Sequence, residues 1–235
     1  MEKGSYCLSA MSASNLVLLF TIGVVTIVMI RIMYIVYRRS KPLNPKSPQP
    51  LSALIVLGSG GHTAEMLNLL NVLQMERFKP RFYIAAATDN MSLQKARVYE
   101  DSLLDKAGVD AVGRAEFMQI YRSREVGQSY ITSIGTTLIA IAHALWLMIK
   151  IRPKVILCNG PGTCVPLCVI AFFFKLQVLG IRWSSVFYVE SIARVRKLSL
   201  SGLLLYKLHM VDQLFVQWPK LKEKHPRAHY VGCLM

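Results

Sequence analysis

The chain has 235 residues, 53% of them apolar, and 28 Lys and Arg against 13 Asp and Glu give a formal net charge of +15. This balance favours phosphate partners, on an anionic membrane or a pyrophosphate substrate. The absence of interleaved basic and aromatic residues, and of zinc-ligand or helix-turn-helix spacing, argues against nucleic acid.

The first predicted element is a membrane-spanning helix over residues 16–37, which follows a short N-terminal segment, residues 1–15. It opens with LVLLFTIGVVTIVMI, and its 22 residues exceed the roughly 20 that cross a hydrocarbon core. A cleaved signal peptide is the alternative, but small residues would then follow the apolar run, whereas a basic cluster does. That cluster outweighs Lys3, so residues 1–15 are expected in the lumen and the rest of the chain in the cytosol.

Residues 38–50 are basic and then proline-rich (KPLNPKSPQP), which predicts an extended spacer. Residues 51–235 are long enough for one domain, and short β-branched runs alternate there with helical patterns, which predicts a parallel sheet of βαβ units. The predicted strands are residues 53–57, 81–87, 154–158, 186–189 and, as the last, 213–217; the predicted helices are 63–75, 92–100, 135–149 and 166–176. Residues 113–130 have no clean period and are predicted to form a long basic loop, either functional or merely solvated.

The strongest local signal is LGSGGHT, between the first strand and the first helix of this domain. Its glycines allow a tight turn and a close backbone approach, and the helix that follows offers free N–H groups to a phosphate. It is no dinucleotide fingerprint, because Thr63 stands where a glycine is needed and no acidic residue follows at the right distance. Nor is it a Walker loop, which needs Gly-Lys before Ser or Thr. His62 could donate to a phosphate, act as a base or cap the helix.

Two further turns follow predicted strands. The sequence NGPGT begins at Asn159, and two glycine-rich turns of one parallel sheet would share its carboxyl edge, where such sheets bind ligands. The sequence YVESIAR places Glu190 and Arg194 four residues apart, so they could pair across one helical turn, as a structural ion pair or as ligand contacts. Ser191 could cap that helix or bond a ligand.

In chain order, GSGGHT, RSREV, NGPGTCVP, YVESIAR with LSLSG, and VQWP resemble the asparagine-linked glycosylation protein fourteen family. The resemblance covers nearly all of the chain after the spacer. It implies a membrane-anchoring subunit of the endoplasmic-reticulum UDP-N-acetylglucosamine transferase, which adds the second sugar to dolichol-diphosphate-N-acetylglucosamine at the cytosolic face. The fold implied is α/β: a Rossmann-like parallel sheet equivalent to the N-terminal, acceptor-side half of a GT-B glycosyltransferase.

Size agrees with half of such an enzyme, since a whole GT-B transferase needs far more than the about 190 residues that follow the anchor. The resemblance implies that the other half is a soluble UDP-GlcNAc-binding subunit, the asparagine-linked glycosylation protein thirteen. The chain would then be catalytic only when paired, and the preceding or following glycosyltransferase of the pathway could also dock. A pure membrane adapter without catalytic residues is the alternative function.

The resemblance also implies roles for residues of this chain. His62 and Glu190 are the candidates for the base that deprotonates the attacking 4-hydroxyl. No metal or cofactor is expected, because helix dipoles and basic residues can stabilise the leaving UDP. The residues implied to hold the acceptor diphosphate are Gly58, Ser59, Gly60, Gly61, Thr63, Arg122, Arg124, Asn159, Gly160, Gly162, Thr163, Ser191 and Arg194. The partner contact is carried over to the tail, Tyr230, Val231, Gly232, Cys233, Leu234 and Met235.

The apolar helix at residues 135–149, with Trp146 and residues 172–174, could contact the bilayer near a lipid acceptor. Core burial is nevertheless the expectation for most of those positions.

Overall fold

A computed structural model describes residues 13–37, 50–108, 113–122, 128–160, 163–176 and 184–233. The chain divides into two units, Met1–Arg39 and Ser40–Met235. The first unit contains helix α1 (Ala13–Tyr37), which starts three residues before the predicted span and ends with it. Its segment Ser14–Arg31 has a mean hydropathy of 2.0 and is long and apolar enough to cross a membrane. The Thr21 and Thr26 hydroxyls donate to carbonyls of the preceding turn, as an apolar surrounding requires.

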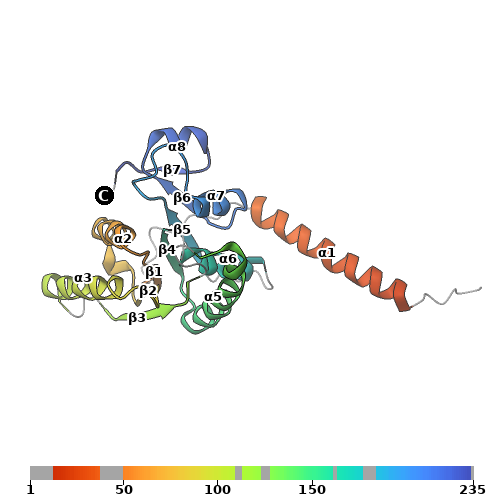
Figure 1. Cartoon of the computed structure of the whole chain (residues 1–235), viewed down its shortest axis with the longest axis horizontal. Coiled ribbons are helices and arrows are strands. Elements are labelled where there is room, and N and C mark those ends of the chain that lie inside the picture. Colours follow the sequence, from red (N-terminus) through yellow and green to blue (C-terminus); the bar gives the residue numbers. More distant parts are fainter. Residues whose placement is uncertain are drawn as a thin grey trace, which may run out of the picture. The chain divides into compact units, whose positions relative to one another are not determined.

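The second unit is built on one seven-stranded sheet in the order β3-β2-β1-β4-β5-β6-β7, and every neighbouring pair is parallel (Figure 1). The strands are β1 (Ala53–Val56), β2 (Arg81–Ala86), β3 (Ala115–Ile120), β4 (Val155–Asn159), β5 (Ser185–Val189), β6 (Gln213–Val216) and β7 (His229–Tyr230). The central strands β1 and β4 are buried throughout, which explains their continuous apolar runs. The strand order is that of a Rossmann-like fold, so the predicted fold class is confirmed.

The predicted long loop at residues 113–130 is wrong, because it contains the edge strand β3 and the first residue of helix α5. Strand β3 pairs with β2 over its whole length. Most of its side chains are only half-buried, and it carries Glu116 and Gln119, so the apolar pattern of a buried strand is missing. The final strand β7 was also missed, since two residues give too short a pattern.

Helices cover both faces of the sheet. Helices α2 and α3 pack on one face, and α5, α6 and α7 pack on the other (Figure 1). The helical elements are α2 (Gly61–Val72), the 3-10 turn η1 (Met75–Arg77), α3 (Ser92–Ala107), α5 (Tyr130–Ile151), α6 (Cys164–Leu176), α7 (Leu200–Lys207) and α8 (Pro219–Lys224).

Helix α5 packs against α6 and strand β3, and its buried residues form a narrow stripe of Ala140, Ala144, Leu147 and Met148. Its outer face is also apolar: Leu138 is 63% exposed and Trp146 55%, and Ile134, Ile139 and Ile149 are similar. The expectation of core burial for most of this helix is therefore wrong. Only the side of α5 that meets α6 and the sheet is buried, so its other apolar side chains are left exposed.

The chain leaves β1 toward β2 on one side and returns to β4 on the other, so β1 and β4 lie side by side with Val56 opposite Cys158. Open α/β sheets commonly bind their ligands at such a switch point, outside the carboxyl ends of the strands. Strand β5 is the next neighbour of β4, so its turn lies at the same edge.

Candidate active site

The turn between β1 and α2 is shaped by Gly60, whose φ of +63° favours glycine. Gly60 is also the N-cap of α2, and no side chain caps this helix end. His62 therefore does not cap the helix, which removes one of its three predicted roles. The buried Thr63 hydroxyl donates to the Gly58 carbonyl and contacts Ser92 Oγ at 2.5 Å, so it ties this turn to the start of α3.

The His62 side chain lies over two glycines from different turns. A Cβ on Gly160 would approach His62 Cγ to 2.9 Å, and a Cβ on Gly58 would approach His62 Cβ to 2.6 Å. Gly160 also has a φ of +87°, which other residues rarely adopt. The first and second glycine turns are thus in contact, and the absence of a side chain at both positions makes room for His62.

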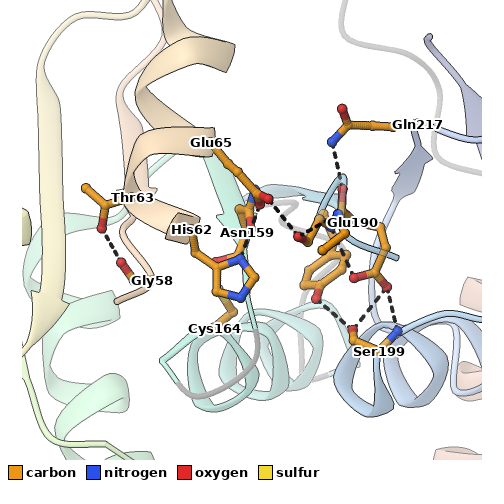
Figure 2. Close-up of polar contacts among 12 residues, drawn as sticks. Gly58, His62, Thr63, Glu65, Asn159, Cys164, Glu190, Ser199 and Gln217 are labelled. Atoms are coloured by element: carbon orange, nitrogen blue, oxygen red, sulfur yellow. Dashed lines mark hydrogen bonds and ion pairs between the residues drawn. The ribbon is translucent and has the colours of Figure 1, made fainter. Parts of the chain in front are cut away.

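A residue that the sequence reasoning missed, Glu65, joins all three turns (Figure 2). Its Oε2 lies 3.2 Å from His62 Nδ1 and accepts a hydrogen bond from Asn159 Nδ2 at 3.0 Å. Its Oε1 accepts from Ser191 Oγ at 2.7 Å. The signal in the sequence was the spacing of His62 and Glu65, three residues apart on one helix, which makes them neighbours.

Glu190 lies in the third turn but is 1% exposed, and its carboxylate is occupied by protein donors. Oε1 accepts from the Ser191 N–H, and Oε2 accepts from the Ser199 N–H at 2.9 Å and the Ser199 hydroxyl at 3.0 Å. Burial raises the pKa of Glu190, against the opposing effect of these hydrogen bonds. Ser199 is the N-cap of α7, so Glu190 fastens the third turn to the start of that helix.

The predicted helical pairing of Glu190 with Arg194 is wrong, because the chain becomes helical only at Leu200. The VQWP motif at the end of β6 instead forms hydrogen bonds with the third turn. Gln217 Nε2 donates to the Glu190 carbonyl at 3.0 Å, and Trp218 Nε1 donates to the Ile192 carbonyl at 2.7 Å.

Two of the described arginines lie near the carboxyl edge of the sheet. Arg122 follows β3, and its Nη2 donates to Ser59 Oγ at 2.6 Å, beside the first glycine turn. Arg194 is exposed on the third turn. Thr163, by contrast, is buried at the start of α6. Arg124 and Gly162 lie outside the described residues, as do Leu234 and Met235 of the predicted partner contact.

The described part of the tail follows the last edge strand. Tyr230 and Val231 are exposed, and so is Cys233. This leaves the tail open along the β7 side of the sheet. The other described cysteines, Cys158, Cys164 and Cys168, are buried.

Replacing Gly202 with alanine is expected to lower the free energy of unfolding by about 1–3 kcal/mol, because the site is overpacked. The new methyl group would collide with Glu190 Oε2 and lie 3.0 Å from Ser199 Oγ. Denaturant unfolding of the full chain measures the change. The matched control is Gly135→Ala on α5, where nothing lies within 4 Å of the new Cβ. Equal stability of Gly202→Ala and wild type would contradict the Glu190–Ser199 junction.

Comparison with known proteins places these features in a family. A family model described as "Oligosaccharide biosynthesis protein Alg14 like" matches residues 53–234. The chain is 43% identical over 213 residues to UDP-N-acetylglucosamine transferase subunit ALG14 of Rattus norvegicus, which covers 91% of this chain and 94% of that protein. It is 42% identical over 224 residues to the subunit of the same name from Homo sapiens, covering 94% and 98%.

Among solved structures, a crystal structure of UDP-N-acetylglucosamine 2-epimerase aligns with a TM-score of 0.47 and 15% identity, over 74% of this chain and 42% of that one.

Proposed function

Because the chain belongs to the family of Alg14-like oligosaccharide biosynthesis proteins, we propose that it is the membrane-anchored, acceptor-side subunit of a UDP-N-acetylglucosamine transferase. The reaction proposed is the addition of the second N-acetylglucosamine to dolichol-diphosphate-N-acetylglucosamine at the cytosolic face of the endoplasmic reticulum. The domain would then be the acceptor half of a GT-B-type enzyme.

The observation that carries this proposal is the meeting of three strand-ending turns around His62 and Glu65 at one edge of the sheet. The N-terminal end of α2 is free of a side-chain cap, and Arg122 donates to Ser59 in the same turn, so backbone N–H groups and a positive charge lie together where a diphosphate would be favoured. An acceptor held there by its diphosphate would place its sugar near His62, outside the carboxyl ends of the strands.

Of the two candidate bases, His62 fits the reaction better. Its side chain is 30% exposed at the carboxyl edge of the sheet, whereas the Glu190 carboxylate is buried and bonded to Ser191 and Ser199. In the proposed step the 4-hydroxyl oxygen of the acceptor bonds to C1 of the donor sugar. The bond from C1 to the UDP oxygen breaks, and the hydroxyl proton passes to His62. UDP leaves with the bonding electron pair.

The donor nucleotide is proposed to be held by a soluble UDP-GlcNAc-binding subunit, the asparagine-linked glycosylation protein thirteen. The exposed residues Tyr230, Val231 and Cys233 support the tail as the place where this partner docks. Helix α1 would hold the complex at the membrane, with the basic residues that follow it on the cytosolic side.

The test is reconstitution of the full chain and its soluble partner in vesicles that contain the dolichol-linked acceptor and receive UDP-GlcNAc. Transfer by the pair, and by neither chain alone, is the expected result. Turnover by this chain alone would show a self-sufficient enzyme. Full transfer after replacement of both His62 and Glu190 by alanine, with the partner still recruited, would favour the pure adapter.

The exposed apolar face of α5 is expected to seat the domain on the bilayer near the lipid acceptor. The double substitution Leu138→Glu and Trp146→Glu should lower transfer to a bilayer-embedded acceptor by about 10-fold or more, since each side chain contributes on the order of 1–2 kcal/mol when buried in lipid. Transfer to a short-chain, water-soluble acceptor should change little. The matched control is Val98→Glu, an exposed apolar position on α3. Equal losses with both acceptors would contradict this role for α5.

A further inference from the structure

We infer that Glu65 is a positioning residue that fixes the ring and the tautomer of His62, so that Nε2 is the atom that takes the proton. This inference rests on the proposed transfer reaction and adds a residue to it. Glu65 is not expected to touch the acceptor, because its carboxylate is 13% exposed and faces protein groups.

The carboxylate is bonded on both oxygens by groups from three turns. Oε2 meets His62 Nδ1 and Asn159 Nδ2, and Oε1 meets Ser191 Oγ. His62 and Ser191 follow β1 and β5, and Asn159 is the last residue of β4, the strand that lies between them in the sheet. Figure 2 shows Glu65 reaching down from α2 to this meeting point. One carboxylate therefore sets the spacing of the three turns.

The tautomer of His62 follows from the chemistry of its partner. An ionised carboxylate only accepts hydrogen bonds, so a proton must lie on Nδ1 of His62 at the 3.2 Å contact. In the neutral ring the lone pair is then on Nε2. No hydrogen bond from another described residue to His62 Nε2 is present, so this atom is available to the acceptor hydroxyl.

The ring cannot easily turn to another partner. Gly58 and Gly160 pack against its Cβ and Cγ, so the space on that side is filled. A glutamine at position 65 would keep the shape of the side chain. Its amide has one oxygen and an NH₂ group, however, and the three donors from His62, Asn159 and Ser191 need two acceptor oxygens. Glu65→Gln therefore removes the charge and one acceptor oxygen of residue 65 while it keeps the volume of the side chain.

The first test reads the tautomer directly. The full chain with ¹⁵N-labelled histidine is reconstituted in nanodiscs with its partner, and the ring nitrogens are observed by NMR. The chain has five histidines, and His62→Gln assigns the signal of interest. We expect neutral His62 to be protonated on Nδ1 in the wild type and to lose this preference in Glu65→Gln. A wild-type His62 protonated on Nε2, or an unchanged tautomer in Glu65→Gln, would overturn the inference.

The second test measures transfer by the reconstituted pair. Glu65→Gln is expected to lower kcat by about 10- to 100-fold, by analogy with the loss of carboxylates that orient metal-ligating histidines. KM for UDP-GlcNAc should stay within about 3-fold, because the donor is bound by the partner. The matched control is Glu116→Gln, since Glu116 forms an exposed ion pair with Arg114 on β3.

A cycle of variants shows whether the two residues act together. If Glu65 works through His62, the double variant His62→Ala and Glu65→Gln should be no slower than His62→Ala alone. If the two losses multiply, Glu65 has a separate role and the inference is wrong. An inactive wild-type pair would instead contradict the proposed function, and the NMR test would still decide the tautomer.

Discussion

The alanine variant of His62 is expected to lose about 10²- to 10⁴-fold in kcat of the reconstituted transferase, the usual contribution of a general base. The His62 ring is partly exposed at the carboxyl edge of the sheet, and the structure brings the first two glycine turns around it. The replacement removes the ring without adding bulk, so the turns should remain folded. Steady-state transfer to the dolichol-linked acceptor, with UDP release followed in parallel, measures the effect.

Two controls accompany this measurement. Partner recruitment by His62→Ala is followed by co-sedimentation with vesicles and should equal that of wild type, because the exposed tail lies in β7 and beyond. His225→Ala, whose ring packs on Tyr206 beside α8, is the matched replacement and should keep kcat within about 2-fold. Full activity of His62→Ala would exclude His62 as the base and would leave Glu190, or a residue of the partner, as the candidate base.

The largest effect on stability is expected from Glu100→Ala, which should cost about 3–5 kcal/mol of unfolding free energy because it leaves a buried charge without its partner. Glu100 accepts from Arg81 Nε and Nη2, each at 2.7 Å, and from the Tyr83 hydroxyl at 2.6 Å. Arg81 is fully buried at the first residue of β2. Burial, with the nearby Glu100 carboxylate, holds the pKa of Tyr83 well above its usual value.

This cluster begins at Arg81, the first residue of β2, and so lies toward the edge of the sheet opposite His62. Glu100→Ala should therefore reduce the folded fraction while the folded protein keeps its rate of transfer. Denaturant unfolding gives the stability, and activity is normalised to folded protein. The double replacement Arg81→Met and Glu100→Leu should recover much of the loss, since a packed apolar pair can substitute for a buried ion pair. A loss below 1 kcal/mol for Glu100→Ala would contradict the buried ion pair.

Much of the fold follows from patterns that the sequence displays locally. Strands β1 and β4 are buried on both faces, so their apolar runs are unmistakable, and glycines mark the turns that follow them. Strand β3 could not be recognised in this way, because an edge strand can carry Glu116 and Gln119 among half-buried neighbours. Periodicity also could not show which apolar positions of α5 meet the sheet, since its residues are apolar on every side.

The candidate site was predicted in part for a similar reason. A glycine-rich turn directly after a strand is visible in the local sequence, so the two glycine turns at the carboxyl edge of the sheet could be predicted. The contacts of Glu65 with Asn159 and Ser191 span 94 and 126 residues of sequence, and no local pattern encodes them. The burial of Glu190 and its contacts with Ser199 depend on the position at which α7 begins. The four-residue spacing of Glu190 and Arg194 wrongly suggested that a helix begins earlier, next to Glu190.

The outward face of α5 has a consequence for handling the protein. Deleting α1 would remove one apolar segment, but Leu138, Trp146 and Ile149 would still present apolar surface to water. Exposed patches of this kind cause self-association, and the positive charge of the chain would add binding to anionic lipids and polymers. A shortened chain should therefore aggregate or need detergent during purification, and its partner alone would not relieve this if it docks at the tail.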